Sequence, residues 1–205
     1  RFAEMRRMGI KTVMITGAGG SIGAELCRQV ARFGVSHLIC ADVSEASVYT
    51  LEQELRIAHP DMQGHYYTAN VREPDRLLAI ARQHPPAVVF HAAAYKHVPL
   101  MESLNEIEAL RTNVLGTLNA ARMAGTVGAR RFVLVSTDKA VNPTNVMGAS
   151  KRVAEQMVQA AAAEHPHTHY VAVRFGNVLG SSGSVVPLFT TQIAKGGPVT
   201  VTHPD

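Results

Sequence analysis

Residues 12–23 read Thr-Val-Met-Ile-Thr-Gly-Ala-Gly-Gly-Ser-Ile-Gly, an apolar run that leads directly into a glycine-rich turn. The run predicts a buried strand over Thr12–Thr16, and the residues after the turn predict a helix from about Ser21. Glycines at this spacing allow a tight turn, a close approach of the backbone to a pyrophosphate, and close packing of helix on strand. They are Gly17, Gly20 and Gly23. A phosphate at such a turn faces the helix N-terminus, so the stretch predicts a nucleotide site.

A carboxylate follows at the position that would bind the ribose of the nucleotide. Asp42 closes the second apolar run, 19 residues after Gly23, where it can accept hydrogen bonds from an adenosine ribose. Its charge repels a 2′-phosphate, so we expect NAD rather than NADP as the cofactor. The structural alternative is an ordinary glycine turn with Asp42 as a helix cap.

Six apolar runs rich in β-branched residues alternate with segments of helical periodicity. They are Thr12–Thr16, Leu38–Ala41, Tyr66–Ala69, Ala87–Ala92, Phe132–Ser136 and Tyr170–Phe175. This alternation predicts an α/β fold, a doubly wound parallel sheet of the Rossmann type with helices on both faces. We expect an N-terminal helical remnant over residues 1–10, an NAD-binding domain over 11–180, and the truncated start of a C-terminal substrate lobe over 181–205. We also expect that both ends are cut from a longer protein.

The composition argues against several classes of protein. The 20 basic residues only slightly outnumber the 16 acidic ones and are scattered, so we expect no nucleic-acid partner. No apolar run has the length of a membrane span, and we expect this fragment to make no membrane contact. Cys27 and Cys40 fall in a predicted helix and a predicted strand, which favours burial over a disulfide. We expect no metal, because His165, His167 and His169 are typical of a surface loop.

Polar and small residues follow the third and fourth runs. Asn70-Val71 lies where adenine would be held, although Asn70 could also cap the next helix. Lys96 and His97 follow the fourth run as candidates for substrate contacts, with a structural loop histidine as the alternative for His97. The residues predicted to bind the cofactor from these patterns are Gly17, Gly19, Gly20, Ser21, Ile22, Gly23, Asp42, Asn70, Val71, His91, Ala92 and Ala93.

The segment Ser136–Lys151 (STDKAVNPTNVMGASK) carries the candidate chemistry. A lysine four residues after a tyrosine shares a helix face with it and lowers the pKa of the phenol, so the pair can take a proton from an alcohol. Met147 stands where that tyrosine is expected, and a thioether cannot do this. The acid–base groups must then come from Thr137, Asp138, Lys139 and Lys151. Alternatively, Thr137 and Asp138 only form a capped turn, and Met147 is a packing residue in an inactive site.

Five strings make the chain resemble a known family. They are Thr16–Gly23 (TGAGGSIG), His91–Met101 (HAAAYKHVPLM), Asn113–Thr117 (NVLGT), Ser136–Lys151, and Arg174–Val186 (RFGNVLGSSGSVV). In these strings the chain is similar to the extended short-chain dehydrogenase/reductases, and specifically to the nucleotide-sugar 4,6-dehydratases of the CapD-like polysaccharide-biosynthesis family. The strings span nearly the whole chain, and the last three are far more specific than the glycine turn.

The resemblance implies a UDP-N-acetylglucosamine 4,6-dehydratase, a lyase that makes a UDP-4-keto-6-deoxy-sugar for polysaccharides or glycans. Bound NAD would oxidise C4, water would leave across C5 and C6, and the hydride would return to C6. Met147 points to the long branch of the family, which retains the configuration at C5. The parent protein would then be anchored in the inner membrane, with this domain on the cytoplasmic face. We also expect a homo-oligomer, formed through the helices of the fourth and fifth crossovers.

Residue roles are assigned from the resemblance and from the position of each string. We expect Asp138 to act as the acid at the C6 hydroxyl, which requires a raised pKa, and Lys139 to act as the base at C5, which requires a lowered pKa. Thr137 would contact the C4 hydroxyl, and Lys151 would bind the nicotinamide ribose of the cofactor. Asn113 would help to hold the catalytic helix through backbone or water contacts. The residues predicted to bind the UDP-sugar are Lys96, Asn177, Val186 and Pro187.

Two other functions stay open. A nucleotide-sugar C4 epimerase also oxidises C4 transiently, but it has no use for an acid and a base poised at C5 and C6. Asp138 and Lys139 therefore argue against it. In a non-catalytic NAD-binding protein, Met147 would mark the loss of chemistry.

Overall fold

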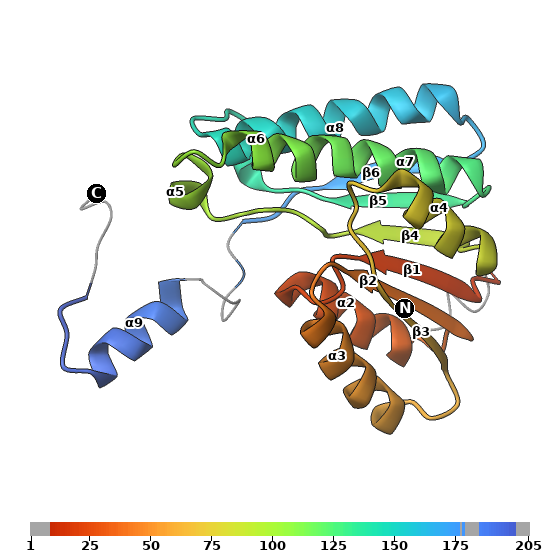
Figure 1. Ribbon diagram of the computed structural model, residues 1–205, viewed down its shortest axis with the longest axis horizontal. Coiled ribbons are helices and arrows are strands. Elements are labelled where there is room, and N and C mark those ends of the chain that lie inside the picture. The colour runs from red at the N-terminus through yellow and green to blue at the C-terminus, as the bar shows by residue number, and fades with distance from the viewer. Residues whose placement is uncertain (1–8, 177, 179–184, 200–205) are drawn as a thin grey trace. The chain divides into compact units, whose positions relative to one another are not determined.

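The six strands form one parallel sheet in the order β3-β2-β1-β4-β5-β6 in a computed structural model of the chain (Figure 1). The structure describes residues 9–176, 178 and 185–199. The strands are β1 (Thr12–Thr16), β2 (His37–Asp42), β3 (Gln63–Thr68), β4 (Val88–His91), β5 (Arg131–Val135) and β6 (His169–Val173). The order reverses between β1 and β4, which creates the crevice where open α/β sheets bind ligands. The predicted doubly wound α/β fold is confirmed.

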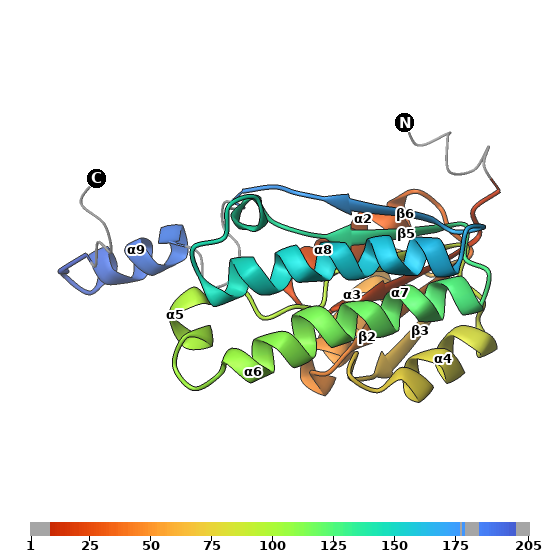
Figure 2. The ribbon, with the colours of Figure 1, turned by 90° about the horizontal axis from the view of Figure 1, so that it is seen from above.

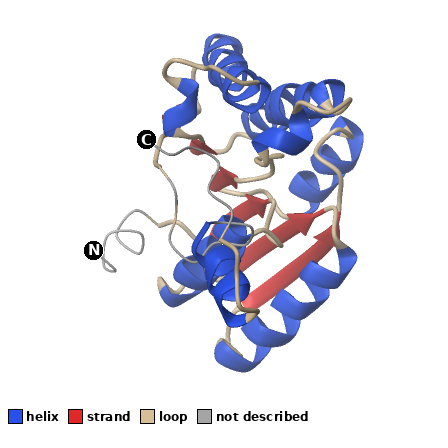
Figure 3. Cartoon of the chain, turned by 90° about the vertical axis from the view of Figure 1, so that its left-hand side faces the viewer, coloured by secondary structure: helices blue, strands red, loops and turns tan. Residues whose placement is uncertain are grey.

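Helices cover both faces of the sheet (Figure 2 and Figure 3). One layer contains α2 (Ser21–Arg32) and α3 (Glu45–Ala58), and the other contains α4 (Pro74–Gln83), α7 (Gly116–Thr126) and α8 (Val146–Glu164). The short elements are α5 (Val98–Met101), α6 (Glu106–Ala109), the π-helical η1 (Leu110–Leu115) and the 3-10 helix η2 (Asp138–Ala140). Because α6, η1 and α7 follow one another without a break, they form one long helical run.

The central strand β1 contributes side chains to the core on both faces of the sheet. Met14 packs into the cluster that contains α7 and α8, whereas Val13 and Ile15 pack into the cluster that contains α2 and α3. None of the three side chains is exposed. A strand buried on both faces is apolar at every position rather than at alternate ones, which is why the run around Met14 predicts it so clearly.

The edge strand β3 differs most from its prediction. The apolar pattern predicts a strand over Tyr66–Ala69, whereas the strand runs over Gln63–Thr68. It begins earlier because Gln63 pairs with His37 at the start of β2. No apolar pattern marks this beginning, since an edge strand is only half buried and does not need one.

The two cysteines lie together between α2 and β2. Cys27 and Cys40 are free thiols without exposed surface, and their sulfur atoms are 3.6 Å apart. The predicted burial of both cysteines is confirmed. Both thiols belong to the packing of α2 on the sheet.

The chain divides into two units, Arg1–Phe175 and Gly176–Asp205. The sheet belongs to the first unit, and α9 (Val185–Ala194) belongs to the second, so each is described by itself. The helical remnant predicted over residues 1–10 lies outside the described residues, except for its last two. Within the part of the chain that the structure describes, no helix combines the length and the apolar character needed to cross a membrane.

Candidate functional site

The turn between β1 and α2 presents backbone instead of side chains. Gly17 has a φ of +74°, and a Cβ there would collide with the backbone of Ala93. A Cβ at Gly23 would collide with the carbonyl of Gly17, so α2 packs directly on the turn. Gly20 is the N-cap of α2 and has no side chain to cap the first-turn amides. The turn therefore has a geometry that can accept a phosphate at a helix N-terminus.

Asp42 lies beside this turn, at the end of β2. Its Oδ2 accepts a hydrogen bond from the amide of Gly19 at 2.9 Å, and its Oδ1 accepts one from the amide of Ser44 at 2.9 Å. The N-cap of α3 is Ser44, whose hydroxyl accepts from the amide of Ser47, so Asp42 is not the helix cap. Each carboxylate oxygen has a second lone pair, so Asp42 can still accept a hydrogen bond from a ribose hydroxyl.

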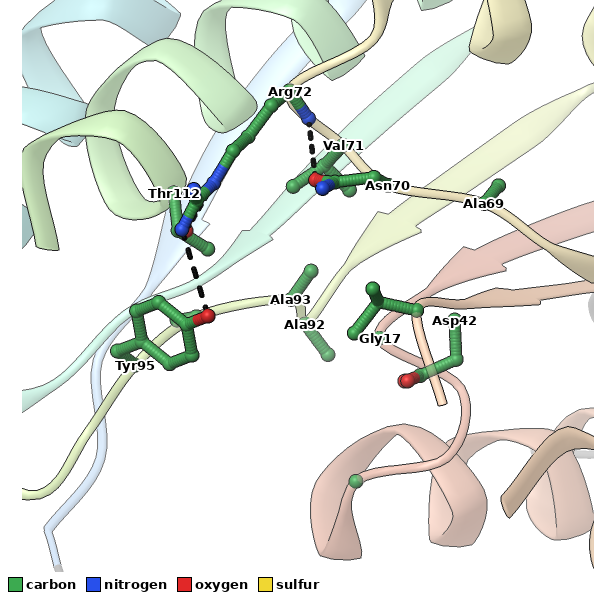
Figure 4. Close-up of a pocket in the computed structure, with 13 residues that line it drawn as sticks. Gly17, Asp42, Ala69, Asn70, Val71, Arg72, Ala92, Ala93, Tyr95 and Thr112 are labelled. Carbon is green, nitrogen blue, oxygen red and sulfur yellow. Dashed lines mark hydrogen bonds between the residues drawn. The ribbon is translucent and has the colours of Figure 1, made fainter. Parts of the chain in front are cut away.

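A pocket opens between the glycine turn and the loops after β2, β3 and β4 (Figure 4). Of the predicted cofactor residues, it brings together Gly17, Gly20, Asp42, Asn70, Val71, Ala92 and Ala93. Gly19 lines the adjoining groove between α2 and α3, and Ser21 and Ile22 lie in the first turn of α2. The pocket is also lined by residues not predicted as cofactor contacts, which are Val43, Ala69, Arg72, Ala94, Tyr95 and Thr112. Val43, Ala69, Arg72 and Ala94 each adjoin a predicted cofactor residue in the sequence, which is the signal that could have identified them. Tyr95 and Thr112 do not, although they adjoin Lys96 and Asn113, for which other roles are predicted.

Asn70 shapes the loop after β3. Its side-chain oxygen accepts a hydrogen bond from the amide of Arg72 at 3.0 Å, and its carbonyl accepts one from the amide of Glu73 at 3.0 Å. The N-cap of α4 is Glu73, so the alternative role of Asn70 as the cap is not found. Asn119 on α7 donates to the carbonyl of Val71 at 3.0 Å, which fixes the loop against the helical run.

Arg72 belongs to the wall of the pocket opposite the glycine turn, as Figure 4 shows. Its Nε and Nη2 donate to the hydroxyl of Thr112 at 2.9 and 2.7 Å, and its Nη1 lies 2.6 Å from the carboxylate of Glu108. The guanidinium also lies 5.8 Å from the ring centre of Tyr95. Arg72 thus ties the loop after β3 to the loop after β4 and to the helical run.

His91 lies in the core rather than in the pocket lining, and its side chain has no exposed surface. Its Nδ1 is 2.6 Å from the hydroxyl of Thr16, and its Nε2 is 3.0 Å from the hydroxyl of Thr117, which itself donates to the carbonyl of Asn113. Nε2 therefore carries the proton, and Nδ1 accepts from Thr16. Burial, followed by the positive charge of Lys151, lowers the pKa of His91 to about 3. The structure therefore gives this predicted cofactor residue a supporting position behind the pocket.

Asn113, in η1, connects the pocket to α8. Its Oδ1 accepts from the amide of Tyr95 at 2.8 Å, and its Nδ2 donates to the carbonyl of Tyr95 at 3.0 Å and to the hydroxyl of Ser150 at 2.9 Å. Ser150 immediately precedes Lys151 on α8. Asn113 thus contacts α8 through a side-chain hydrogen bond, whereas the resemblance implies backbone or water contacts.

Thr137, Asp138 and Lys139 lie just after β5, at the carboxyl edge of the sheet. The hydroxyl of Thr137 donates to Oδ1 of Asp138 at 3.0 Å, and Nζ of Lys139 donates to the same oxygen at 3.2 Å. These bonds, the one from Thr137 first, hold the pKa of Asp138 below its ordinary value. The direction is opposite to the one that an acid role requires, because the carboxylate is 56% exposed and both neighbours stabilise its charge. Thr137 also accepts from the amide of Lys139, so the capped turn of the alternative interpretation is present.

Lys151 is a buried lysine, 5% exposed, whose Nζ donates to the carbonyl of Val135 at 2.7 Å. Burial lowers the pKa of Lys151 to about 8, while the negative charge of Glu155 opposes the shift. Such a lysine can hold or release a proton near neutral pH. Met147 is equally buried, and its carbonyl accepts from the hydroxyl of Ser150 at 2.8 Å. Its thioether contributes packing and carries no proton.

The predicted substrate residues fall in different parts of the chain. Lys96 is exposed in the loop after β4, as is the candidate His97. Asn177 lies outside the described residues, and Val186 and Pro187 lie on α9 in the second unit. Among the described residues, no group of histidine, cysteine or acidic side chains could hold a metal ion.

Known proteins are similar to nearly the whole of this chain. The polysaccharide biosynthesis protein family matches residues 13–205. The capsular polysaccharide biosynthesis protein CapD of Staphylococcus aureus is 50% identical over 201 residues, which are 98% of this chain and 33% of CapD. A UDP-glucose 4-epimerase of Rickettsia canadensis is 38% identical over 200 residues, which are 95% of this chain and 57% of the epimerase. The chain thus spans only about a third of the first relative.

Solved structures share the same fold. Pen from Bacillus thuringiensis matches with a TM-score of 0.83 at 35% identity, over 90% of this chain and 56% of Pen. DesIV from Streptomyces venezuelae, a dTDP-glucose 4,6-dehydratase determined with NAD bound, matches with a TM-score of 0.76 at 21% identity, over 92% of this chain and 63% of DesIV. At that identity, the likeness to DesIV shows the fold alone.

Proposed function

The chain belongs to the polysaccharide biosynthesis protein family, and on that premise we propose that it is the NAD-binding catalytic part of a nucleotide-sugar 4,6-dehydratase. The substrate is UDP-N-acetylglucosamine, and the product is a UDP-4-keto-6-deoxy-sugar for polysaccharide or glycan biosynthesis. The observation that carries the proposal is the arrangement at one edge of the sheet. A dinucleotide pocket, the triplet Thr137-Asp138-Lys139 and the buried Lys151 all lie at the carboxyl ends of the strands.

The residues of the pocket fit NAD. The turn around Gly17 and Gly20 suits a pyrophosphate at the N-terminus of α2. Asp42 suits the adenosine ribose, and its charge disfavours the extra phosphate of NADP. The loop at Asn70-Val71 suits the adenine, and DesIV, which has the same fold, was determined with NAD. Bound NAD supplies the hydride chemistry, by taking a hydride from C4 of the sugar and returning it to C6.

The proton transfers belong to residues of this chain. Thr137 contacts the C4 hydroxyl and passes its proton toward Lys151 or solvent as the hydride leaves. Lys151, with a pKa of about 8, is mostly an ammonium at pH 7 and suits the ribose, and its neutral fraction can accept that proton. A proton passed from the ammonium of Lys139 to Oδ1 of Asp138, 3.2 Å away, prepares both roles: the neutral amine of Lys139 then removes the proton at C5, and the protonated Asp138 gives its proton to the departing C6 hydroxyl. Because the free Asp138 is exposed and charged, its acid role requires the substrate to bury it, since burial raises the pKa of a carboxyl group.

Met147 supports the finer assignment to the long branch of the family. A buried thioether at this position fits a site in which no phenol transfers protons. On this basis we assign retention of configuration at C5, and a parent protein anchored in the inner membrane with this part on the cytoplasmic face. We also assign a homo-oligomer formed through α7 and α8. Fractionation of cells that express the full-length protein, and light scattering of the purified protein, test the last two assignments.

The decisive experiment uses the full-length protein, UDP-N-acetylglucosamine and mass spectrometry. The sugar nucleotide is expected to lose one water. In deuterated water, the product is expected to carry solvent deuterium at C5, because the proton removed there exchanges with solvent. A product without that deuterium rules out the elimination route.

A nucleotide-sugar C4 epimerase is the second candidate, favoured by the identity to the Rickettsia canadensis enzyme. An epimerase leaves the mass of the sugar nucleotide unchanged and inverts C4, which NMR of the product detects. It also keeps its rate when Asp138 is replaced by Asn, whereas a dehydratase does not. A non-catalytic NAD-binding protein leaves the sugar nucleotide unaltered.

A further inference from the structure

A buried carboxylate with no assigned role lies on α8, one helical turn after Lys151. Glu155 is 6% exposed. Its Oε1 accepts from the hydroxyl of Ser136 at 2.6 Å and from Nε of Arg174 at 2.9 Å, and its Oε2 accepts from Nη2 of Arg174 at 2.6 Å. Arg152, also on α8, reaches Oε2 at 3.3 Å. These charge-assisted bonds hold the carboxylate in one orientation.

The partners of Glu155 belong to the strand ends that carry the candidate chemistry. Ser136 follows β5 and directly precedes the triplet, while Arg174 follows β6. The two strand ends stay paired beyond the sheet, where the amide of Asp138 donates to the carbonyl of Phe175 at 3.2 Å. Glu155 therefore joins α8 to the ends of β5 and β6 through a single side chain.

Glu155 is also the counter-charge of Lys151. The hydrogen bonds from Arg174, followed by the one from Ser136, hold the pKa of Glu155 below its ordinary value, so it is ionised at neutral pH. Residues four apart share a helix face, and the charge of Glu155 raises the pKa of Lys151 against the effect of burial. The other groups whose charge acts on this pair are the neutral His91 of β4 and the cations Arg152 and Arg174. Asp138 and Lys139 of η2, which packs on α8, form an exposed ion pair with each other. Glu155 is the buried negative charge beside Lys151.

We propose that Glu155 is a positioning residue, which fixes the strand end that carries Thr137-Asp138-Lys139 and supplies the negative charge that keeps Lys151 an ammonium in a buried site. The reaction that it serves rests on the proposed function, but the positioning itself does not. Without the carboxylate, Lys151 would face burial and the Arg174 cation unopposed, and would lose its proton at lower pH.

The test follows the protonation of Lys151 by NMR. The chain contains five lysines, so carbon-13 labelling of their Cε atoms gives few signals, and Lys151→Arg identifies the relevant one. In the wild type the midpoint is expected near pH 8. We expect Glu155→Gln to lower the midpoint by about half a pH unit or more. Arg174→Gln should raise it, because this change removes a cation and leaves the charge of Glu155 less neutralised.

The direction of the shift in Glu155→Gln separates positioning from a merely structural role. If Glu155 only held the fold together, its substitution would loosen the site, admit water to Lys151 and raise the pKa of Lys151 toward the ordinary value. Glu164→Gln is the matched control, because Glu164 is on the same helix and binds Arg122 at 2.8 and 2.7 Å, but is exposed. This control should leave the midpoint unchanged.

A raised or unchanged midpoint in folded Glu155→Gln would overturn the proposal. If that variant does not fold, Arg152→Gln decides, because it removes an exposed cation beside Glu155 without loosening the site. It should raise the midpoint, and an unchanged midpoint overturns the proposal. If the full-length protein does not turn over UDP-N-acetylglucosamine, the proposed function fails while the NMR result stands. Where turnover occurs, the pH profile of kcat should move to lower pH in Glu155→Gln and return toward wild type in Glu155→Asp.

Discussion

The side-chain amide of Asn113 donates to the hydroxyl of Ser150 at 2.9 Å and so joins the helical run after β4 to the helix that carries Lys151. Asn113 has no exposed surface, and its remaining hydrogen bonds hold the backbone of Tyr95 at the pocket. Both protons of the amide and its oxygen are used. Removal of the amide therefore leaves buried partners without hydrogen bonds, which costs more than the bonds themselves contribute.

Asn113→Ala should lower the free energy of unfolding by about 2 kcal/mol, and Ser150→Ala should lower it by about 1 kcal/mol. Because the two residues share a bond, the double variant should cost less than the sum. Urea denaturation measures the free energy of unfolding of the two single variants and of the double variant. Asn105→Ala, which removes hydrogen bonds in an exposed loop, is the control and should cost less than about 0.5 kcal/mol. Strictly additive costs would mean that the Asn113–Ser150 bond contributes nothing.

Arg72→Ala should release bound NAD faster than the wild type. The guanidinium holds the pocket wall through Thr112 and Glu108, and its loss frees the loop after β3. Loss of such charged hydrogen bonds predicts about tenfold faster dissociation, measured by chasing fluorescent NADH with excess NAD. Arg111→Ala is the matched control, since Arg111 also pairs with Glu108, at 2.8 Å, without lining the pocket. Equal rates in both variants would assign the effect to Glu108 and not to the wall.

Strand β1 and the side of the pocket formed by the glycine turn are predictable from the sequence, because they depend on local backbone geometry. Residues 12–23 directly predict the tight turn at Gly17 and the close packing of the following helix on it at Gly23. The opposite wall is not predictable in this way, because Arg72 and Thr112 are 40 residues apart and meet only when the helical run packs on the loop. The hydrogen-bond partners of Glu155 are likewise distant in the sequence: Ser136 lies 19 residues before it and Arg174 lies 19 residues after it, each at the end of a strand. The charge state of Asp138 is also a tertiary property, since it depends on exposure and on side-chain hydrogen bonds.

His91 should make the stability of the fold fall as the pH drops below about 6.5. Its pKa is about 3 in the folded protein and about 6.5 in the unfolded chain. Between these values the unfolded chain binds a proton that the folded protein does not. The contribution of neutral His91 is therefore complete above pH 6.5 and is lost as the pH falls, with a slope of up to about 1.4 kcal/mol per pH unit.

Carboxylates such as Glu155 also lose stabilising charge in acid, so the measurement for His91 is a difference between two proteins. In His91→Gln the side chain keeps a donor and an acceptor but does not titrate. The free energy of unfolding of this variant, measured by urea denaturation between pH 6.5 and 4, should fall less steeply than that of the wild type. Parallel curves would contradict a buried, neutral His91.

Gly23→Ala and Gly20→Ala should separate folding from cofactor binding. A Cβ at Gly23 collides with the carbonyl of Gly17, so this variant should lose about 2 kcal/mol of stability. A Cβ at Gly20 would lie 3.4 Å from that oxygen, and the φ of −74° is ordinary, so stability should change by less than about 0.5 kcal/mol. The added methyl group would stand where the pyrophosphate approaches, and NAD should bind about tenfold more weakly or worse. Thermal melting with and without NAD tests both, and equal destabilisation by the two variants would assign Gly20 to the fold instead.

Asp138 faces the strictest requirement of the proposed chemistry, because an acid must be protonated, whereas Asp138 is a charged carboxylate in the free protein. The hydroxyl of Thr137, followed by the ammonium of Lys139, holds the pKa of Asp138 below its ordinary value. If Asp138 delivers its proton only to the C6 hydroxyl, Asp138→Asn should slow water loss about 10²-fold. The first reduction of bound NAD, followed by the absorbance of the reduced nicotinamide in a single turnover, should change little. Equal slowing of both steps would remove Asp138 from the acid role.

Thr137→Val is the companion variant, and its pH dependence has a definite sign. It removes the hydroxyl that stabilises the Asp138 carboxylate at 3.0 Å, so the pKa of Asp138 should rise toward its ordinary value. The protonated acid then persists to higher pH, and the alkaline limb of water loss should move to higher pH even if the overall rate falls with the loss of the Thr137 contact. A limb that stays in place would mean that another group donates the proton. A limb that moves to lower pH would mean that the hydroxyl of Thr137 favours the protonated form of Asp138 once the sugar is bound.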